Sequence, residues 1–142
     1  MSLTPLTPLQ PTLDQPMIDQ LTPTDFADWL LRVTPITPIT PITPATRPLV
    51  LDVREPWELQ TASVKEDGFD LLHIPMRDVP ARLAELKDAH GLTHPIAVLC
   101  HHGMRSDHIA TLLAENGFTQ VVNVAGGIDA WTQQVDPSVP TY

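Results

Sequence analysis

Residues 96–117 read IAVLCHHGMRSDHIATLLAENG. The first five residues form an apolar run, preceded by Pro95, that is typical of a buried strand. From Ser106 the spacing of apolar residues is that of an amphipathic helix, and Gly117 is a common kind of helix stop. A short glycine-containing loop therefore joins a strand to a helix, which is the repeating unit of parallel α/β sheets.

The same alternation continues on both sides of this unit. Helix signals include Thr22 as an N-cap before Pro23, in a helix that runs to about Arg32, and Gly126-Gly127 before a last helix with Trp131 in the core. Further strands are expected at 49–53, 70–74, 120–124 and, at an edge, 17–21, and a further helix at 79–91. The sequence predicts an α/β fold with a parallel sheet and helices on both faces.

Two segments of low complexity interrupt this pattern. Residues 2–15 are rich in proline, and residues 34–46 repeat the triplet Thr-Pro-Ile. Proline at every third position favours polyproline II over helix or strand. The repeat is either a proline-rich ligand for a partner or an expansion tolerated in a surface loop. We expect an N-terminal arm at 1–16, a domain at 17–135 that carries the insert 34–46, and a tail at 136–142.

Composition restricts the classes of function. Eight basic and 17 acidic residues give a formal net charge of −9, which argues against nucleic acid or an anionic membrane as a partner. The single cysteine allows no intrachain disulfide, and the N-terminus lacks the basic and apolar regions of a signal peptide. A cytoplasmic location is therefore expected.

Cys100 is placed where a reactive thiol is useful. It ends a buried strand, and ligands of open parallel sheets bind beyond the carboxyl ends of the strands. The amides that begin the next helix have no partners within it, so they attract anions and stabilise a thiolate or a persulfide. Gly103 lets the loop wrap around the sulfur. Arg105 and Ser106 offer donors to an oxyanion such as thiosulfate, and we expect the sulfur to be partly exposed.

Some of these residues have a second interpretation. Arg105 either binds an anion or forms an ion pair with a carboxylate. His101 and His102 lie beside the cysteine, but adjacent residues seldom ligate one ion and no second cysteine offers zinc-site spacing, so no metal is expected. The two histidines shape the pocket, tune the electric field around Cys100 or face solvent.

Four blocks of sequence, taken together and in this order, resemble a rhodanese-like domain. They are LVLDVREPWEL (49–59), HIPMRDVPARLAEL (73–86), AVLCHHGMRS (97–106) and VVNVAGGIDAW (121–131). The last residues, DPSVPTY, resemble those of small bacterial single-domain members. The resemblance implies a sheet of about five strands, a covalent persulfide on Cys100 and no other cofactor. It also implies a loop that binds substrate and persulfide, formed by His101, His102, Gly103, Met104, Arg105 and Ser106.

Asp52 and Arg54 match an Asp-Val-Arg motif of that family at the end of a strand. Asp52 either pairs with Arg105 or organises the loop, and Arg54 either binds an anion or braces the sheet edge. Trp57 is expected to pack within a short helix. One departure concerns the Gly-His-Ile-Pro-Gly turn common in the family, because His73 here belongs to a strand. We therefore expect His73 to be a partly buried, hydrogen-bonded residue rather than an equivalent of that histidine.

The function expected from the resemblance is sulfur transfer. Cys100 would take a sulfane sulfur from thiosulfate or a persulfide and pass it to cyanide, a small thiol or a protein thiol. One alternative is a phosphatase or an arsenate reductase, in which related loops hold an oxyanion. Those loops resemble Cys-x5-Arg, whereas this chain has the shorter Cys-x4-Arg between Cys100 and Arg105. Another alternative is a sulfur carrier or partner-binding module with little turnover of small molecules.

Overall fold

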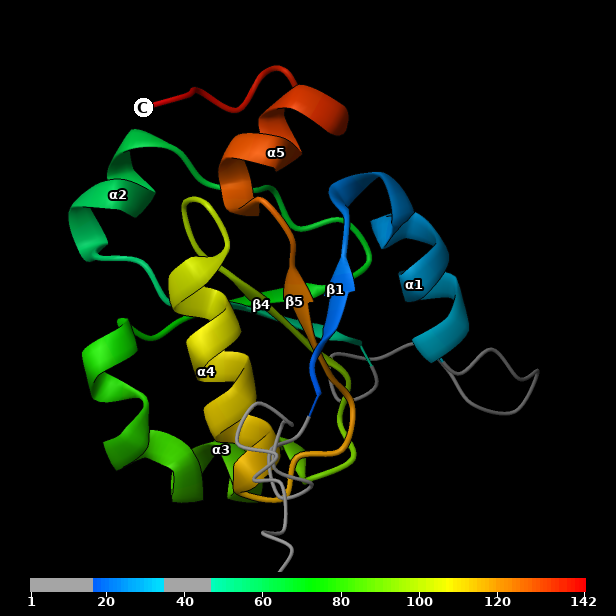
Figure 1. Ribbon diagram of the computed structural model, residues 1–142, viewed down its shortest axis with the longest axis vertical. Helices are drawn as coiled ribbons and strands as arrows, with labels where there is room; N and C mark the ends of the chain where they lie inside the picture. The colour runs from blue at the N-terminus through cyan, green and yellow to red at the C-terminus, as the bar shows by residue number, and fades with distance from the viewer. Residues whose placement is uncertain (1–16, 35–46) are drawn as a thin grey trace, which may run out of the picture.

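The computed structural model describes residues 17–34 and 47–142. In this part of the chain, five parallel strands form one sheet in the order β1-β5-β4-β2-β3 (Figure 1). The strands are β1 (Asp19–Leu21), β2 (Leu49–Asp52), β3 (Asp70–His73), β4 (Ile96–Leu99) and β5 (Val121–Val124). The helices are α1 (Phe26–Val33), α2 (Pro56–Thr61), α3 (Leu83–His90), α4 (Met104–Glu115) and α5 (Gly127–Gln134). The expected parallel α/β fold is confirmed, whereas the arm 1–16 and the repeat at 35–46 lie outside the described residues.

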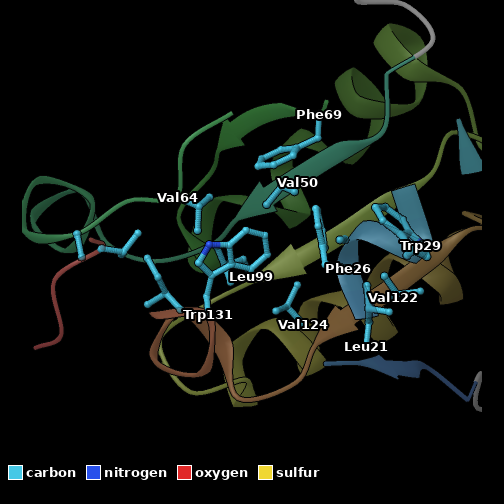
Figure 2. Packing of buried hydrophobic residues seen from close by; sticks show 14 residues of the cluster. Leu21, Phe26, Trp29, Val50, Val64, Phe69, Leu99, Val122, Val124 and Trp131 are labelled. Carbon is cyan, nitrogen blue, oxygen red and sulfur yellow. The ribbon is translucent and has the colours of Figure 1, made fainter. Parts of the chain in front are cut away.

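The sheet is covered on both faces. Successive residues of a strand point to opposite faces, and the buried apolar side chains divide accordingly into two clusters. Val50 and Leu99 belong to the cluster that includes side chains of α1 and α5, and Figure 2 shows this cluster. Leu51 and Val98 belong to the cluster that includes side chains of α3 and α4. The strands β2, β4 and β5 are buried along their whole length, and their residues are apolar except for Asp52 at the end of β2 and Asn123 in β5.

Aromatic side chains fill much of the α1–α5 side. The ring of Phe26 lies 4.8 Å from that of Trp131 and 5.4 Å from that of Phe69, in both cases edge to face, which is a favoured aromatic geometry. The prediction that Trp131 lies in the core is confirmed. The prediction for Trp57 is wrong, since this side chain is 60% exposed. Its ring instead meets the ring of Tyr142 edge to face, with 5.9 Å between centroids.

Several helices begin or end at residues other than those expected. The helix predicted to begin at Thr22 starts as a 3-10 turn at Pro23–Asp25 before α1, and the helix predicted at 79–91 has a 3-10 turn at Pro80–Arg82 before α3. The helix α4 begins at Met104, two residues earlier than expected. None of the helices in the described ranges is long and apolar enough to cross a membrane.

The residues after α5 return to the sheet edge that carries the cysteine loop. Val139 is buried within the α1–α5 cluster, and Tyr142 packs against the same cluster. This places the Tyr142 side chain close to the loop that begins at Cys100.

Candidate active site

Cys100 directly follows β4, the central strand of the sheet, and lies at its carboxyl edge. The loop carbonyls are held by the beginning of α5. The amide of Ile128 donates to the carbonyl of Cys100 at 2.8 Å, and that of Asp129 donates to the carbonyl of His101 at 3.2 Å. The otherwise unpaired first amides of one helix therefore position the loop that leads into the next.

Glycines allow the close approach of these two segments. A Cβ on Gly127 would overlap the carbonyl oxygens of Cys100 and His101. Gly103 has φ +101°, a left-handed conformation that other residues rarely adopt. With this conformation, the Gly103 amide donates to the Cys100 Sγ at 3.0 Å. The glycine loop expected from the sequence therefore turns a backbone donor toward the sulfur.

The sulfur itself is enclosed. Cys100 is 1% exposed, and the hydroxyl oxygen of Ser106 lies 3.2 Å from Sγ. The expectation of partial exposure is therefore wrong for this conformation. The physical reason is that α4 begins at Met104, so its first turn brings Ser106 over the sulfur.

Arg105 does not point a free guanidinium at the loop. Its two terminal nitrogens donate to the two carboxylate oxygens of Glu58 on α2, at 2.8 and 2.9 Å. The side chain of Glu58 is only 4% exposed, whereas that of Arg105 is 35% exposed. The hydrogen bonds from Arg105, opposed by burial and supported by the Glu55 amide, lower the pKa of Glu58 to about 2. The same hydrogen bonds raise the pKa of Arg105, so the geometry supports the ion-pair interpretation of Arg105.

Asp52 and Arg54 form a second, fully buried ion pair. Arg54 donates to Asp52 through Nε and Nη2, with a shortest distance of 2.8 Å. Arg54 also donates to the carbonyl of Ala62 at 2.9 Å, which ties the end of α2 to the sheet. Asp52 therefore pairs with Arg54 rather than with Arg105, and the structure supports the bracing role of Arg54.

Tyr142 connects this network to the loop. Its hydroxyl accepts from Arg54 Nη1 at 2.8 Å and donates to Glu58 Oε1 at 2.9 Å. Its ring stacks on the His101 ring, with 3.9 Å between centroids and 6° between planes. His101 in turn stacks on His102. Burial, followed by the charge of His102, lowers the pKa of His101, which favours the neutral ring at this position.

The remaining candidate residues are placed as follows. Met104 is exposed at the start of α4. His73 is partly buried, and its Nε2 lies 2.6 Å from the carbonyl oxygen of Arg54, as expected for a hydrogen-bonded structural residue. Among the described residues, no three histidine, cysteine, aspartate or glutamate side chains gather as a metal site would require.

Sequence reasoning missed three residues of the site. Glu58 occupies the third position of α2 and forms a capping box with Glu55, a local signal that marks the helix but not the ion pair. Asn123, which accepts from the Ser106 hydroxyl at 2.5 Å, interrupts the apolar strand β5, and a polar residue in a buried strand was a usable signal. For Tyr142 the sequence holds no local signal, since its partners lie far away along the chain.

Comparison with known proteins agrees with this geometry. The family profile described as "Rhodanese-like domain" matches residues 42–134. A protein of Allochromatium vinosum named "Sulfurtransferase" is 32% identical over 92 residues, which cover 64% of this chain and 78% of that protein. A maize protein named "Adenylyltransferase and sulfurtransferase MOCS3-1" is 38% identical over 94 residues, which cover 66% of this chain.

The chain spans only 20% of that maize protein's length. Among solved structures, a rhodanese-related protein from Thermoplasma volcanium superimposes with a TM-score of 0.62 at 25% identity, covering 87% of this chain and 99% of that one. A family match over more than half of the sequence, on a fold with the cysteine loop at the expected sheet edge, decides the classification. The chain belongs to the rhodanese-like domain family.

Proposed function

We propose that this protein is a sulfurtransferase that carries a sulfane sulfur as a persulfide on Cys100. The observation that supports this most directly is the setting of the sulfur. Sγ is the only thiol of the chain, lies at the N-terminus of α4 and accepts a hydrogen bond from the Gly103 amide. Such a setting favours an anionic sulfur over a neutral one.

The first half-reaction loads the cysteine. The Cys100 thiolate attacks the outer sulfur of thiosulfate, a bond forms between the two sulfurs, and the sulfur–sulfur bond of thiosulfate breaks. Sulfite leaves with the electron pair, and the negative charge moves to the terminal sulfur of the persulfide. A persulfide donor reacts in the same way, with a thiolate as the leaving group.

The second half-reaction regenerates the free Cys100 thiolate. An acceptor nucleophile attacks the terminal sulfur, the bond to Sγ breaks, and Sγ keeps the electron pair as a thiolate. Cyanide, a small thiol or a protein thiol is chemically suited to this role. The name of the Allochromatium vinosum relative is consistent with such chemistry, and a single cysteine is consistent with a reducing compartment such as the cytoplasm.

Phosphatase or arsenate-reductase chemistry is less well supported. It requires a forked donor for an oxyanion, and both terminal nitrogens of Arg105 are engaged by Glu58. Cys-x4-Arg also makes a smaller loop than Cys-x5-Arg. A single sulfur atom needs less room than a tetrahedral anion.

The intact mass of the protein after incubation with thiosulfate tests the proposal. We expect a gain of one sulfur atom, lost again on addition of cyanide with release of thiocyanate. Cys100→Ser is the matched control and should gain no mass and show no turnover while it unfolds like the wild type. A wild-type protein that gains no sulfur from thiosulfate or from a small persulfide would refute the proposal. Loading without turnover would instead identify a sulfur carrier.

A further inference from the structure

A row of polar side chains leads from the surface to the Cys100 sulfur. Gln20 on β1 donates to Asp107 at 2.7 Å and accepts from the amide nitrogen of Asn123 at 2.7 Å. Asn123 accepts from the hydroxyl of Ser106 at 2.5 Å. Ser106 and Asn123 are buried, and the Ser106 oxygen lies 3.2 Å from Sγ. We call Asp107, Gln20, Asn123 and Ser106 the polar row.

Two acceptor groups give the polar row a direction. The carboxylate of Asp107 can only accept, so the Gln20 amide turns its nitrogen to Asp107 and its oxygen to Asn123. Independently, the carbonyl oxygen of Gly103 can only accept, and it lies 3.1 Å from the Asn123 amide nitrogen. Both constraints orient Asn123 in the same way, with its amide oxygen facing Ser106.

The orientation of Asn123 decides where the Ser106 proton lies. An amide oxygen cannot donate, so the single hydroxyl proton of Ser106 is used in the bond to Asn123. Ser106 then presents a lone pair, not a proton, to Sγ. A lone pair accepts from a thiol but repels negative charge on the sulfur, whereas the Gly103 amide remains a donor to Sγ in either state.

We propose that Asn123 is a positioning residue that withholds the Ser106 proton from the Cys100 sulfur. This inference rests on the proposed sulfur transfer only for its role in catalysis. When sulfur is loaded, the negative charge moves from Sγ to the terminal sulfur, away from the Ser106 lone pair. The polar row thus disfavours the unloaded thiolate relative to the persulfide and shifts the equilibrium with thiosulfate and sulfite toward the loaded enzyme.

The sign of one measurement tests this inference. Because Sγ is buried, the thiolate is best followed by its ultraviolet absorbance against pH, with the spectrum of Cys100→Ser subtracted. This difference reports one group, since the chain has one cysteine. Ser106→Ala removes the lone pair, so the midpoint of the titration should move to lower pH. If Ser106 instead donates to the thiolate, the midpoint will move to higher pH.

Two further variants test the role of the polar row. Asn123→Leu frees the Ser106 proton to turn toward Sγ, so its midpoint should lie lower than that of Ser106→Ala. Gln20 is an exposed residue of the edge strand β1. Gln20→Ala removes the acceptor of the Asn123 amide, so it should lower the midpoint of the titration, but by less than Asn123→Leu does. Thr111→Val is the control, because it removes a hydroxyl from α4 that donates to the backbone carbonyl of Asp107 and leaves the Asp107 carboxylate, which holds Gln20, in place.

The outcomes separate this inference from the proposed function. The titration uses unloaded protein and needs no sulfur donor, so it can succeed even if no persulfide forms. A midpoint that rises or stays unchanged in Ser106→Ala would overturn the inference whether or not the protein transfers sulfur. In a protein that loads sulfur, Ser106→Ala should also lower the persulfide fraction reached at a fixed ratio of thiosulfate to sulfite.

Discussion

Arg105 of the cysteine loop is bound through both terminal nitrogens to Glu58 of α2, a residue 47 positions earlier in the chain. The carboxylate is almost completely buried and also accepts from the Tyr142 hydroxyl and the Glu55 amide. A buried carboxylate requires such partners because unpaired charge is costly to bury. The first turn of α4, which follows the cysteine loop, is therefore fastened to α2.

Arg105→Ala should destabilise the protein more than it weakens donor binding. The change leaves Glu58 without two charge-assisted hydrogen bonds, a loss of about 2–3 kcal/mol in the free energy of unfolding, while the KM for thiosulfate should remain nearly unchanged. Urea denaturation measures the free energy of unfolding, and steady-state kinetics on the same preparation measure the KM. Arg82→Ala removes an exposed pair with Glu85 and serves as the control with little effect on either. A large rise in KM with unchanged stability would show that Arg105 binds the donor.

Protonation of Glu58 in acid should destabilise the protein. Its pKa is lowered in the folded state to about 2 from an ordinary value of 4.5. The stabilising contribution is therefore complete above pH 4.5 and is lost as the pH falls toward 2, amounting to at most about 3 kcal/mol. At neutral pH, Glu58→Gln should be less stable than the wild type. Between pH 4.5 and 2, its free energy of unfolding should fall by less than that of the wild type. Parallel curves of unfolding free energy against pH for the two proteins would contradict this assignment.

Substitutions of Tyr142 should separate its hydroxyl from its ring. Tyr142→Phe removes hydrogen bonds to Arg54 and Glu58 but keeps the stack on His101. It should therefore lower the free energy of unfolding by about 1–3 kcal/mol and change kcat little. Tyr142→Ala also removes the stack and should lower kcat, because the His101 side of the loop loses its cover. Equal kcat values for the two variants would show that the ring does not support the loop.

A side chain at Gly127 should displace the cysteine loop. In Gly127→Ala the new Cβ would overlap the carbonyls of Cys100 and His101, and we expect a large loss of turnover. Gly91→Ala is the control, since Gly91 also has positive φ (+86° against +62°), in a backbone conformation that other residues avoid, but has open space around it. Both variants should lose stability, by about 1–3 kcal/mol for Gly91→Ala, and only Gly127→Ala should lose sulfur loading. Equal loading in both would show that the loop tolerates the added methyl group.

The sequence by itself determined the elements and the position of the cysteine. Buried strands such as Ile96–Leu99 read as continuous apolar runs, and glycines such as Gly103 mark turns, because these features depend on neighbours within a few residues. The parallel order of the strands then places their carboxyl ends at one edge. Cys100 at that edge was therefore predictable, as was a helix N-terminus beside it.

Only the tertiary structure decided which polar groups meet around the sulfur. Tyr142 reaches Glu58 across 84 positions of the chain, and Asn123 reaches Gln20 across 103. Such contacts depend on the angles at which helices pack on a twisted sheet, and no local pattern encodes them. The same packing places α4 over Sγ and so encloses a sulfur that the sequence suggested would be exposed. Helix packing also decides the pairing of Arg105 with Glu58. The fold buries the Glu58 carboxylate, and a buried carboxylate is stable only when hydrogen-bond donors such as Arg105 lie beside it.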